Sequence, residues 1–125
     1  MNREKALELL KQHVKKENLL KHMYAVEAIM RELAEYFGED VKKWELTGLL
    51  HDIDFDTIDW KDPTQAKKHG ILGSQILTGK VSDEILRAIR SHNYENLDEQ
   101  PESRMEISLL AADNVSGLII ACALV

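Results

Sequence analysis

The sequence is poor in the residues that build disulfides and thiolate metal sites. Its 125 residues include one cysteine, Cys122, and two prolines. A single cysteine excludes an internal disulfide and a multi-cysteine zinc knuckle, and it is typical of a protein from a reducing compartment. We therefore expect a cytoplasmic protein.

The chain also lacks the marks of secretion, membrane insertion and nucleic-acid binding. Its start, MNREKALELLKQ, is charged and amphipathic and has no apolar centre. Its longest apolar run, VSGLIIACALV over residues 115–125, is too short to cross a bilayer. The net charge of −6 gives no broad basic surface for a nucleic-acid backbone. We expect no membrane partner and no extended nucleic acid, and any phosphate group needs a local site.

Period-two segments of strand composition are missing as well. Leu, Ala, Glu and Lys recur at three- and four-residue intervals instead, which predicts an all-α fold. Helices are expected over about 3–16, 19–37, 41–51, 65–77, 82–91 and 103–125. The acidic stretch between the third and fourth of them contains Pro63 and is expected to be a connection. With 44% hydrophobic residues, the chain suits one domain over 1–125.

The last predicted helix is apolar on nearly every side from Val115 onward. Such a helix needs a covering surface, either within the fold or on a second copy, and the second choice predicts a homo-oligomer. A further alternative is that the chain is shortened, since it ends soon after Asp113. In that case we expect a C-terminal extension to be missing and turnover to be weak.

Imidazoles and carboxylates stand on otherwise apolar helix faces. His22 shares a face with Val26 and Leu33, and Asp113 follows Leu110 in the most hydrophobic segment. An ionised carboxylate buried there is costly unless a cation pairs with it. Each histidine alone is most simply a core residue, but a set from several helices of one bundle indicates a metal site. The set is His22, His51, Asp52, His69, His92 and Asp113.

The order of these residues resembles the HD superfamily of metal-dependent phosphohydrolases. Its signature is a histidine, a His-Asp doublet and a later aspartate on separate helices. The flanking segments are similar too: LLHDID at the doublet, HGILGSQIL around His69, ILRAIRSHN before His92 and LLAADNVSGL around Asp113. The resemblance covers about residues 19–118. It implies a single HD-type helical domain of about six helices around a metal site.

The resemblance also implies which side chains hold metal. One divalent ion is expected at His22, His51, Asp52 and Asp113. A second is expected at His69 and His92, with Asp52 as the bridge. Nitrogen and oxygen ligands without thiolate suit Mn, Fe, Co, Ni or Zn. Asp52 and His51 are the predicted catalytic residues, with Asp52 a ligand first and a base that orients water second.

The substrate that the family resemblance favours is a small phosphorylated molecule, with nucleotides as the first class. Nothing in the sequence chooses between a phosphomonoester and a phosphodiester. The candidates for substrate contact are Lys68, Arg90, Tyr94 and Asp56. The acids Asp54, Asp56 and Asp59 are expected to lie mostly in a solvated loop, where such residues favour turns. The alternative is that one of them, Asp56 or Asp54 before Asp59, supports His51 from behind or recruits a further cation.

Two other functions stay open at this stage. Some HD-fold relatives use the same six ligands to hold two irons and activate oxygen, so the ligands alone do not separate a hydrolase from a di-iron oxygenase. The chain can also be a non-catalytic, metal-stabilised helical module that binds a partner. The apolar C-terminus and the lack of an evident basic pocket favour that alternative.

Overall fold

The computed structural model describes the backbone of residues 1–123 and the side chains of residues 1–117. This part of the chain forms six α-helices and two short 3₁₀ helices, and it contains no strand. The order is α1 (Arg3–His13), α2 (Glu17–Phe37), α3 (Val41–Leu50), η1 (Phe55–Thr57), η2 (Pro63–Lys68), α4 (Ile71–Leu77), α5 (Asp83–Ser91) and α6 (Arg104–Ala123). The prediction of an all-α fold is confirmed.

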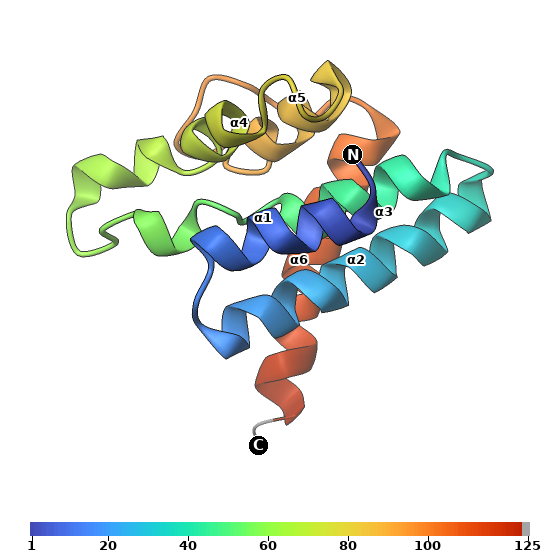
Figure 1. The fold of residues 1–125 in the computed structure, drawn as a ribbon, viewed down its shortest axis with the longest axis horizontal. Coiled ribbons are helices and arrows are strands. Elements are labelled where there is room, and N and C mark those ends of the chain that lie inside the picture. Colours follow the sequence, from blue (N-terminus) through green and yellow to red (C-terminus); the bar gives the residue numbers. More distant parts are fainter. Residues whose placement is uncertain (124–125) are drawn as a thin grey trace.

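Helices α2 and α3 run antiparallel through the centre of the molecule (Figure 1). Gly38 ends α2 in the left-handed conformation, with a φ of 69°. Asp40 then begins α3 by accepting a hydrogen bond from the Lys43 N–H. Gly48 allows the two helices to pack closely, because a Cβ built on it would lie 2.8 Å from the carbonyl oxygen of Val26. This pair positions three of the predicted ligands, His22 on α2 and His51 and Asp52 directly after α3.

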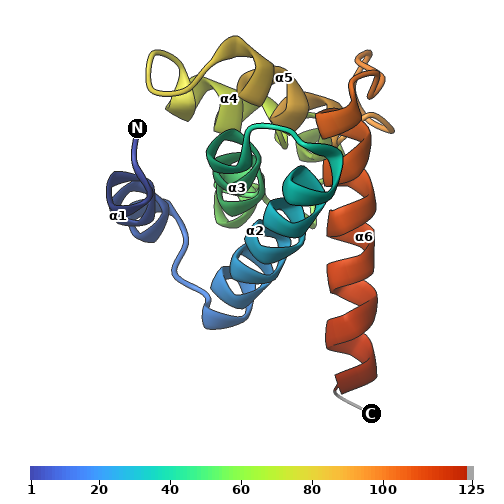
Figure 2. The same cartoon turned by 90° about the vertical axis from the view of Figure 1, so that its right-hand side faces the viewer.

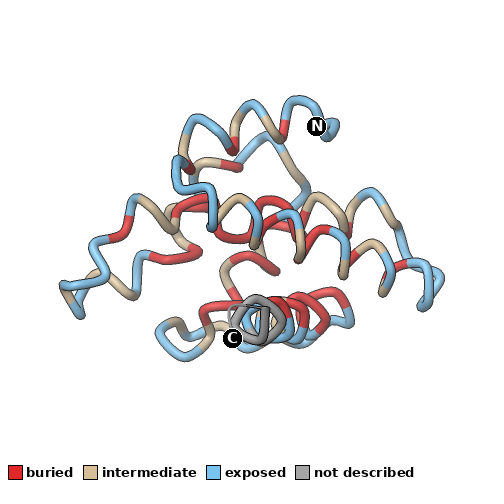
Figure 3. The backbone as a smooth tube through the Cα atoms, turned by 90° about the horizontal axis from the view of Figure 1, so that it is seen from below, coloured by how far each residue is buried: buried red, intermediate tan, exposed pale blue. Residues whose placement is uncertain are grey.

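The other helices cover this pair from several sides. Helix α1 packs on α3, α6 crosses α2 steeply, and α4 and α5 lie together on the other side of α3 (Figures 1 and 2). The buried segments gather at the centre of the molecule (Figure 3). Fully buried apolar side chains there include Met23, Val26, Met30, Leu49, Leu50 and Ile89. Buried side chains of α2, α3 and α5 therefore share one core.

The first helix is shorter than expected. It ends at His13 rather than near Lys16, because Val14 takes an extended conformation and buries its side chain in the core. Helix α2 then begins at Glu17, two residues earlier than predicted. The turn between the two helices brings Lys16 close to the loop that follows the His-Asp doublet.

The prediction of one continuous helix over 65–77 was wrong. Residues Pro63–Lys68 form the 3₁₀ helix η2, His69 is extended, and Gly70 has a φ of 87°. Helix α4 begins only at Ile71. Periodicity did not reveal this break, because its cause is a distant carboxylate described below.

The C-terminal apolar run lies largely outside the described side chains. Within the described part, Val115 on α6 is 46% exposed. The side chains from 118 onward, including Cys122, are outside it. The predicted oligomer surface and the single-domain assignment over 1–125 therefore stay predictions. None of the described helices combines the length and the apolar character that crossing a bilayer requires.

Candidate metal centre

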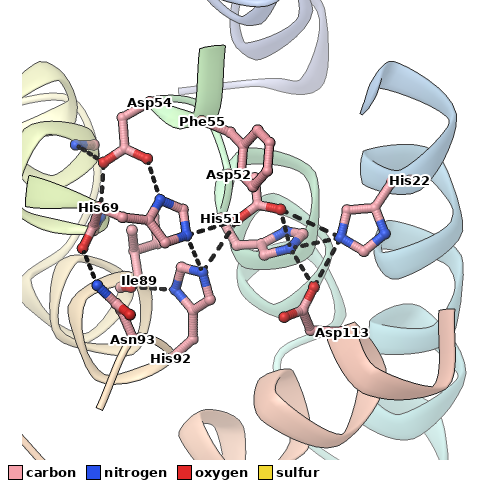
Figure 4. A network of polar contacts seen from close by, with 12 residues as sticks. His22, His51, Asp52, Asp54, Phe55, His69, Ile89, His92, Asn93 and Asp113 are labelled. Atoms are coloured by element: carbon pink, nitrogen blue, oxygen red, sulfur yellow. Dashed lines mark hydrogen bonds and ion pairs between the residues drawn. The ribbon is translucent and has the colours of Figure 1, made fainter. Parts of the chain in front are cut away.

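The structure brings all six predicted ligands together (Figure 4). They come from α2, from the end of α3, from the segments beside α4 and α5, and from α6. Their donor atoms form two groups, each with all its atoms within 4.8 Å of one another. The first group is His22, His51, Asp52 and Asp113, and the second group is Asp52, His69 and His92.

Asp52 lies between the two groups and turns one carboxylate oxygen toward each. Its Oδ2 is 3.3 Å from Nε2 of His22 and 3.3 Å from Nε2 of His51. Its Oδ1 is 3.1 Å from Nε2 of His69 and 3.1 Å from Nε2 of His92. A carboxylate with this placement can serve two ions at once, as bridging carboxylates do in two-metal sites.

The spacing of the donors suits metal coordination. Nε2 of His22 lies 3.2 Å from Nε2 of His51, and Nε2 of His69 lies 3.0 Å from Nε2 of His92. Two nitrogens bound to one ion at zinc-like distances are roughly 2.9 to 3.4 Å apart at right or tetrahedral angles. Asp113 completes the first group, with Oδ1 2.8 Å from Nε2 of His22. The donor set fits a divalent metal ion.

The second nitrogen of each ring fixes which nitrogen faces the centre. Nδ1 of His51 donates to the carbonyl of Gly48 at 2.7 Å, and Nδ1 of His92 donates to the carbonyl of Ile89. A carbonyl oxygen only accepts, so Nδ1 carries the hydrogen in both rings. Their Nε2 lone pairs are then free for a metal, which is the usual arrangement of histidine ligands.

Asp54 orients the third histidine. It is 0% exposed, and its Oδ1 accepts a hydrogen bond from Nδ1 of His69 at 2.7 Å. Its Oδ2 accepts from the N–H groups of Gly70 and Gly73, at 2.7 and 2.8 Å. Through these contacts Asp54 fixes the break in the chain before α4, accepts hydrogen bonds at the start of α4 and holds the His69 ring in place. Its assignment to a solvated loop was wrong, because its three donors come from residues far along the chain.

In the absence of metal, protonated imidazoles offset the negative charge of the carboxylates in the centre. Burial lowers the pKa of His22, but hydrogen bonds to Asp113 and Asp52 outweigh it and raise the pKa to about 9. Burial likewise lowers the pKa of His69, and the two carboxylates Asp52 and Asp54 raise it to about 9. The pKa of Asp52 is well below its usual range, because His51 and the other imidazoles outweigh its burial. Without metal, imidazolium protons thus compensate the carboxylates, and a cation can replace them.

An open pocket of about 930 Å³ leads to these side chains. Two carboxylates and three imidazoles form one wall: Asp52, Asp113, His22, His69 and His92. The start of α2 and the loop after the doublet contribute further lining residues, among them Lys16, Leu19, Phe55 and Trp60. His51 is fully buried and is not part of the lining. It therefore has the position of a ligand rather than of a group that exchanges protons with substrate.

The four candidates for substrate contact lie outside this lining. Arg90 binds Glu99 at 3.0 Å and the hydroxyl of Ser74 at 3.0 Å. Asp56 accepts a hydrogen bond from the Lys15 N–H at 3.0 Å. Lys68 is exposed at the end of η2, and Tyr94 is partly buried. The structure gives none of Lys68, Arg90, Tyr94 and Asp56 a contact with the pocket.

The sequence reasoning missed Lys16, Trp60 and Asn93, which line the pocket. Asn93 donates hydrogen bonds to the carbonyls of His69 and Ala66, both at 2.9 Å, and so holds the segment that carries His69. A usable signal was present for Trp60, which is a large apolar residue in an otherwise acidic connection. Lys16 gave no signal, because its approach to the pocket depends on the turn at Val14.

Comparison with known families agrees with the predicted fold. The HD domain family model matches residues 19–118, most of the chain. The chain belongs to the HD domain family.

Several proteins of known name or structure are similar to this HD domain. Ribonuclease Y of Nitratidesulfovibrio vulgaris (strain DP4) is 32% identical over 103 residues, which cover 81% of this chain and 18% of that protein. Ribonuclease Y of Bacillus subtilis (strain 168) is 31% identical over 108 residues, with the same coverage. The chain thus spans less than a fifth of the length of these relatives. A crystal structure described as a predicted HD superfamily hydrolase, from an uncultured Thermotogales bacterium, has a TM-score of 0.73 and 22% identity over 98% of this chain and 74% of that chain.

Proposed function

We propose that this HD domain is a metal-dependent phosphohydrolase with two metal ions, acting on a small phosphorylated molecule of the nucleotide class. The observation that carries the proposal is the placement of Asp52, with one oxygen toward each histidine group at the wall of an open pocket. Family membership supports it, as do relatives named ribonuclease and a similar fold named hydrolase.

The chain supplies ligands, orientation and a base. Two divalent ions in these groups provide a bound water of lowered pKa and polarise the phosphoryl oxygen. Asp52 and Asp113 would hold these ions as ligands at the pocket wall, and Asp52, a ligand first, would also be the base that orients the attacking water. The buried hydrogen bonds behind His51, His69 and His92 keep the Nε2 atoms aimed at the centre during the reaction.

The test is hydrolysis by defined metal forms. Metal-free protein is loaded separately with Mn²⁺, Co²⁺, Ni²⁺, Zn²⁺ or Fe²⁺ and offered nucleoside monophosphates, cyclic nucleotides and a generic phosphodiester. We expect turnover with at least one ion and its loss in Asp52→Asn. Asp59→Asn, an exposed acid of the same connection, is the matched control and should behave as wild type.

Two results would contradict the proposal. Absence of hydrolysis by every fully loaded form would favour a non-catalytic metal-stabilised module. Oxygen consumption by the iron form, with no release of phosphate or alcohol from any phosphate ester, would favour an oxygenase. Metal analysis of each sample separates both results from incomplete loading.

A further inference from the structure

The pocket has more room than a phosphate group bound beside the two ligand groups would need. The histidines and aspartates of the two ligand groups form one part of the lining of a volume of about 930 Å³. Leu19, Phe55 and Trp60 form an apolar part of the same lining, and the rings of Phe55 and Trp60 lie against the ring of His69. A substrate bound through phosphate at the histidines therefore has apolar side chains beside it.

Trp60 is unusually placed for a tryptophan. It is 44% exposed, whereas Trp44, the other tryptophan, is 2% exposed in the core. Its ring packs on Phe55, with centroids 4.8 Å apart and an angle of 34° between the planes. It also meets the ring of His69 edge-on at 5.3 Å. The indole is thus held beside a predicted metal ligand while much of its surface stays open.

The polar group of this indole is already occupied. Nε1 of Trp60 donates a hydrogen bond to the carbonyl of Phe55 at 3.0 Å, which fixes the ring orientation. The indole therefore has no hydrogen-bond donor left to offer a substrate, and its open surface favours apolar contact with a flat aromatic partner. Aromatic side chains bind bases in this way in many nucleic-acid proteins.

We propose that Trp60, supported by Phe55, is the specificity-determining residue that selects phosphate esters carrying a flat aromatic ring, such as a nucleobase. The proposal rests on the proposed function, because the phosphate is expected at the metal groups. The ring of the substrate stacks on Trp60 while its phosphate lies near His69 and Asp52. Phosphate esters without a ring then bind more weakly at the same centre.

The test uses two phosphonate probes that the proposed reaction does not cleave. One carries adenine on ribose 5-phosphonate, and the other is the ribose 5-phosphonate alone. Each is titrated into metal-loaded protein and followed by tryptophan fluorescence and calorimetry. We expect the adenine probe to quench Trp60, to bind more tightly than the ribose probe and to lose the quenching in Trp60→Phe.

The variants separate stacking from a structural role. Trp60→Ala should weaken binding of the adenine probe by roughly 5- to 150-fold, the range for loss of one base–aromatic stack. It should leave binding of the ribose probe and the metal content unchanged. Trp60→Phe should restore much of the lost affinity. Tyr36→Ala removes a tyrosine that is 83% exposed and does not line the pocket, and it is the matched control.

Other outcomes overturn one claim or the other. Equal affinity for both probes, or equal weakening of both in Trp60→Ala, would contradict the role of Trp60. Failure of the adenine probe to bind the metal-loaded protein would contradict it as well. Tighter binding of the adenine probe together with no hydrolysis of any ester would support the role of Trp60 and would contradict the proposed phosphohydrolase activity.

Discussion

At the scale of single residues, the second group depends on a carboxylate that does not reach the pocket. Asp54 accepts hydrogen bonds from His69, Gly70 and Gly73, and these contacts fix both the His69 ring and the start of α4. Partners behind a ligand commonly change metal affinity by one or two orders of magnitude. The position of His69 is therefore set by Asp54 rather than by its own helix.

Asp54→Ala is expected to weaken binding of the second ion selectively. It leaves the His69 ring without its Nδ1 partner and two backbone N–H groups without an acceptor. Affinity for the second metal should fall by about 10- to 100-fold while the first group still binds one ion. Metal titration by calorimetry measures both steps. Asp59→Ala is the control, and an unchanged second affinity in Asp54→Ala would show that the contact does not position the ligand.

Lys16 is the only lysine or arginine among the residues that line the pocket within the described part of the chain. Its side chain is 75% exposed, and its ammonium lies 3.7 Å from a carboxylate oxygen of Asp56. Because the ammonium is exposed to solvent, Lys16→Ala should raise KM for a phosphate ester by only about 1.5- to 5-fold with kcat nearly unchanged. Steady-state kinetics give both constants.

Lys68→Ala is the matched control for this change. Lys68 is an exposed lysine near His69 that does not line the pocket, so its removal should leave KM unaltered. A larger rise of KM in Lys68→Ala than in Lys16→Ala would contradict the role given to Lys16. It would support Lys68, the lysine predicted from the sequence, as the substrate contact.

At the scale of elements, the close packing of α2 on α3 carries His22 toward His51. Gly48 makes this approach feasible: a Cβ built on it would lie 2.8 Å from the Val26 carbonyl oxygen and 3.0 Å from Cα of Glu27. Both obstacles are backbone atoms of a helix, which do not yield by rotation of a side chain. The α2–α3 distance and the geometry of the first group are thus coupled.

Gly48→Ala should lower the free energy of unfolding by about 1–3 kcal/mol, as overpacking of a core does. Urea denaturation of the metal-free protein measures this change without the contribution of bound metal. Gly117→Ala, on α6, is the control, since a Cβ there meets nothing within 4 Å and alanine favours a helix. Equal stability of Gly48→Ala and wild type would disprove the close contact.

The helices and the clustering of the six predicted ligands could be predicted from patterns in the sequence. The three- and four-residue spacing gave the helix positions, and the HD-like order of histidines and aspartates gave the six residues that the structure brings together. The break before α4 could not be predicted, because Asp54 acts from 15 residues before His69. Among similar acids in the same stretch, only the folded structure separates buried Asp54 from exposed Asp59.

The lining residues outside the ligand set could not be predicted for a similar reason. Lys16 and Trp60 belong to connections, which carry no periodic pattern, and they meet only after the chain has folded. The predicted contacts at Lys68 and Arg90 relied on nearness in sequence to a histidine. Arg90 instead binds Glu99, so closeness along the chain did not give closeness to the pocket.

At the scale of the whole molecule, the candidate metal centre joins segments that lie far apart in the sequence. It connects α2 and the end of α3 with the segments beside α4 and α5 and with α6. In the metal-free protein, protonated imidazoles supply the charge that holds these carboxylates together. Stability and metal binding are therefore linked through protons.

This linkage predicts the pH dependence of stability. The pKa values of His22 and His69 are raised from an ordinary 6.5 to about 9 in the folded protein. Their stabilising contribution is complete below about pH 6.5 and is lost as the pH rises to about 9. The melting temperature of the metal-free protein should fall across this range. Metal-loaded protein should not show the fall, and a rise in the metal-free protein would contradict the proton balance.

The central claim is that two ions, joined by Asp52, act together in hydrolysis. The most direct test is a Mn²⁺ titration of metal-free protein in which bound metal and phosphate-ester hydrolysis are measured in the same samples. The proposed function predicts no turnover without metal and full turnover at two bound ions per chain. Full turnover at one bound ion, or none at two, would contradict it.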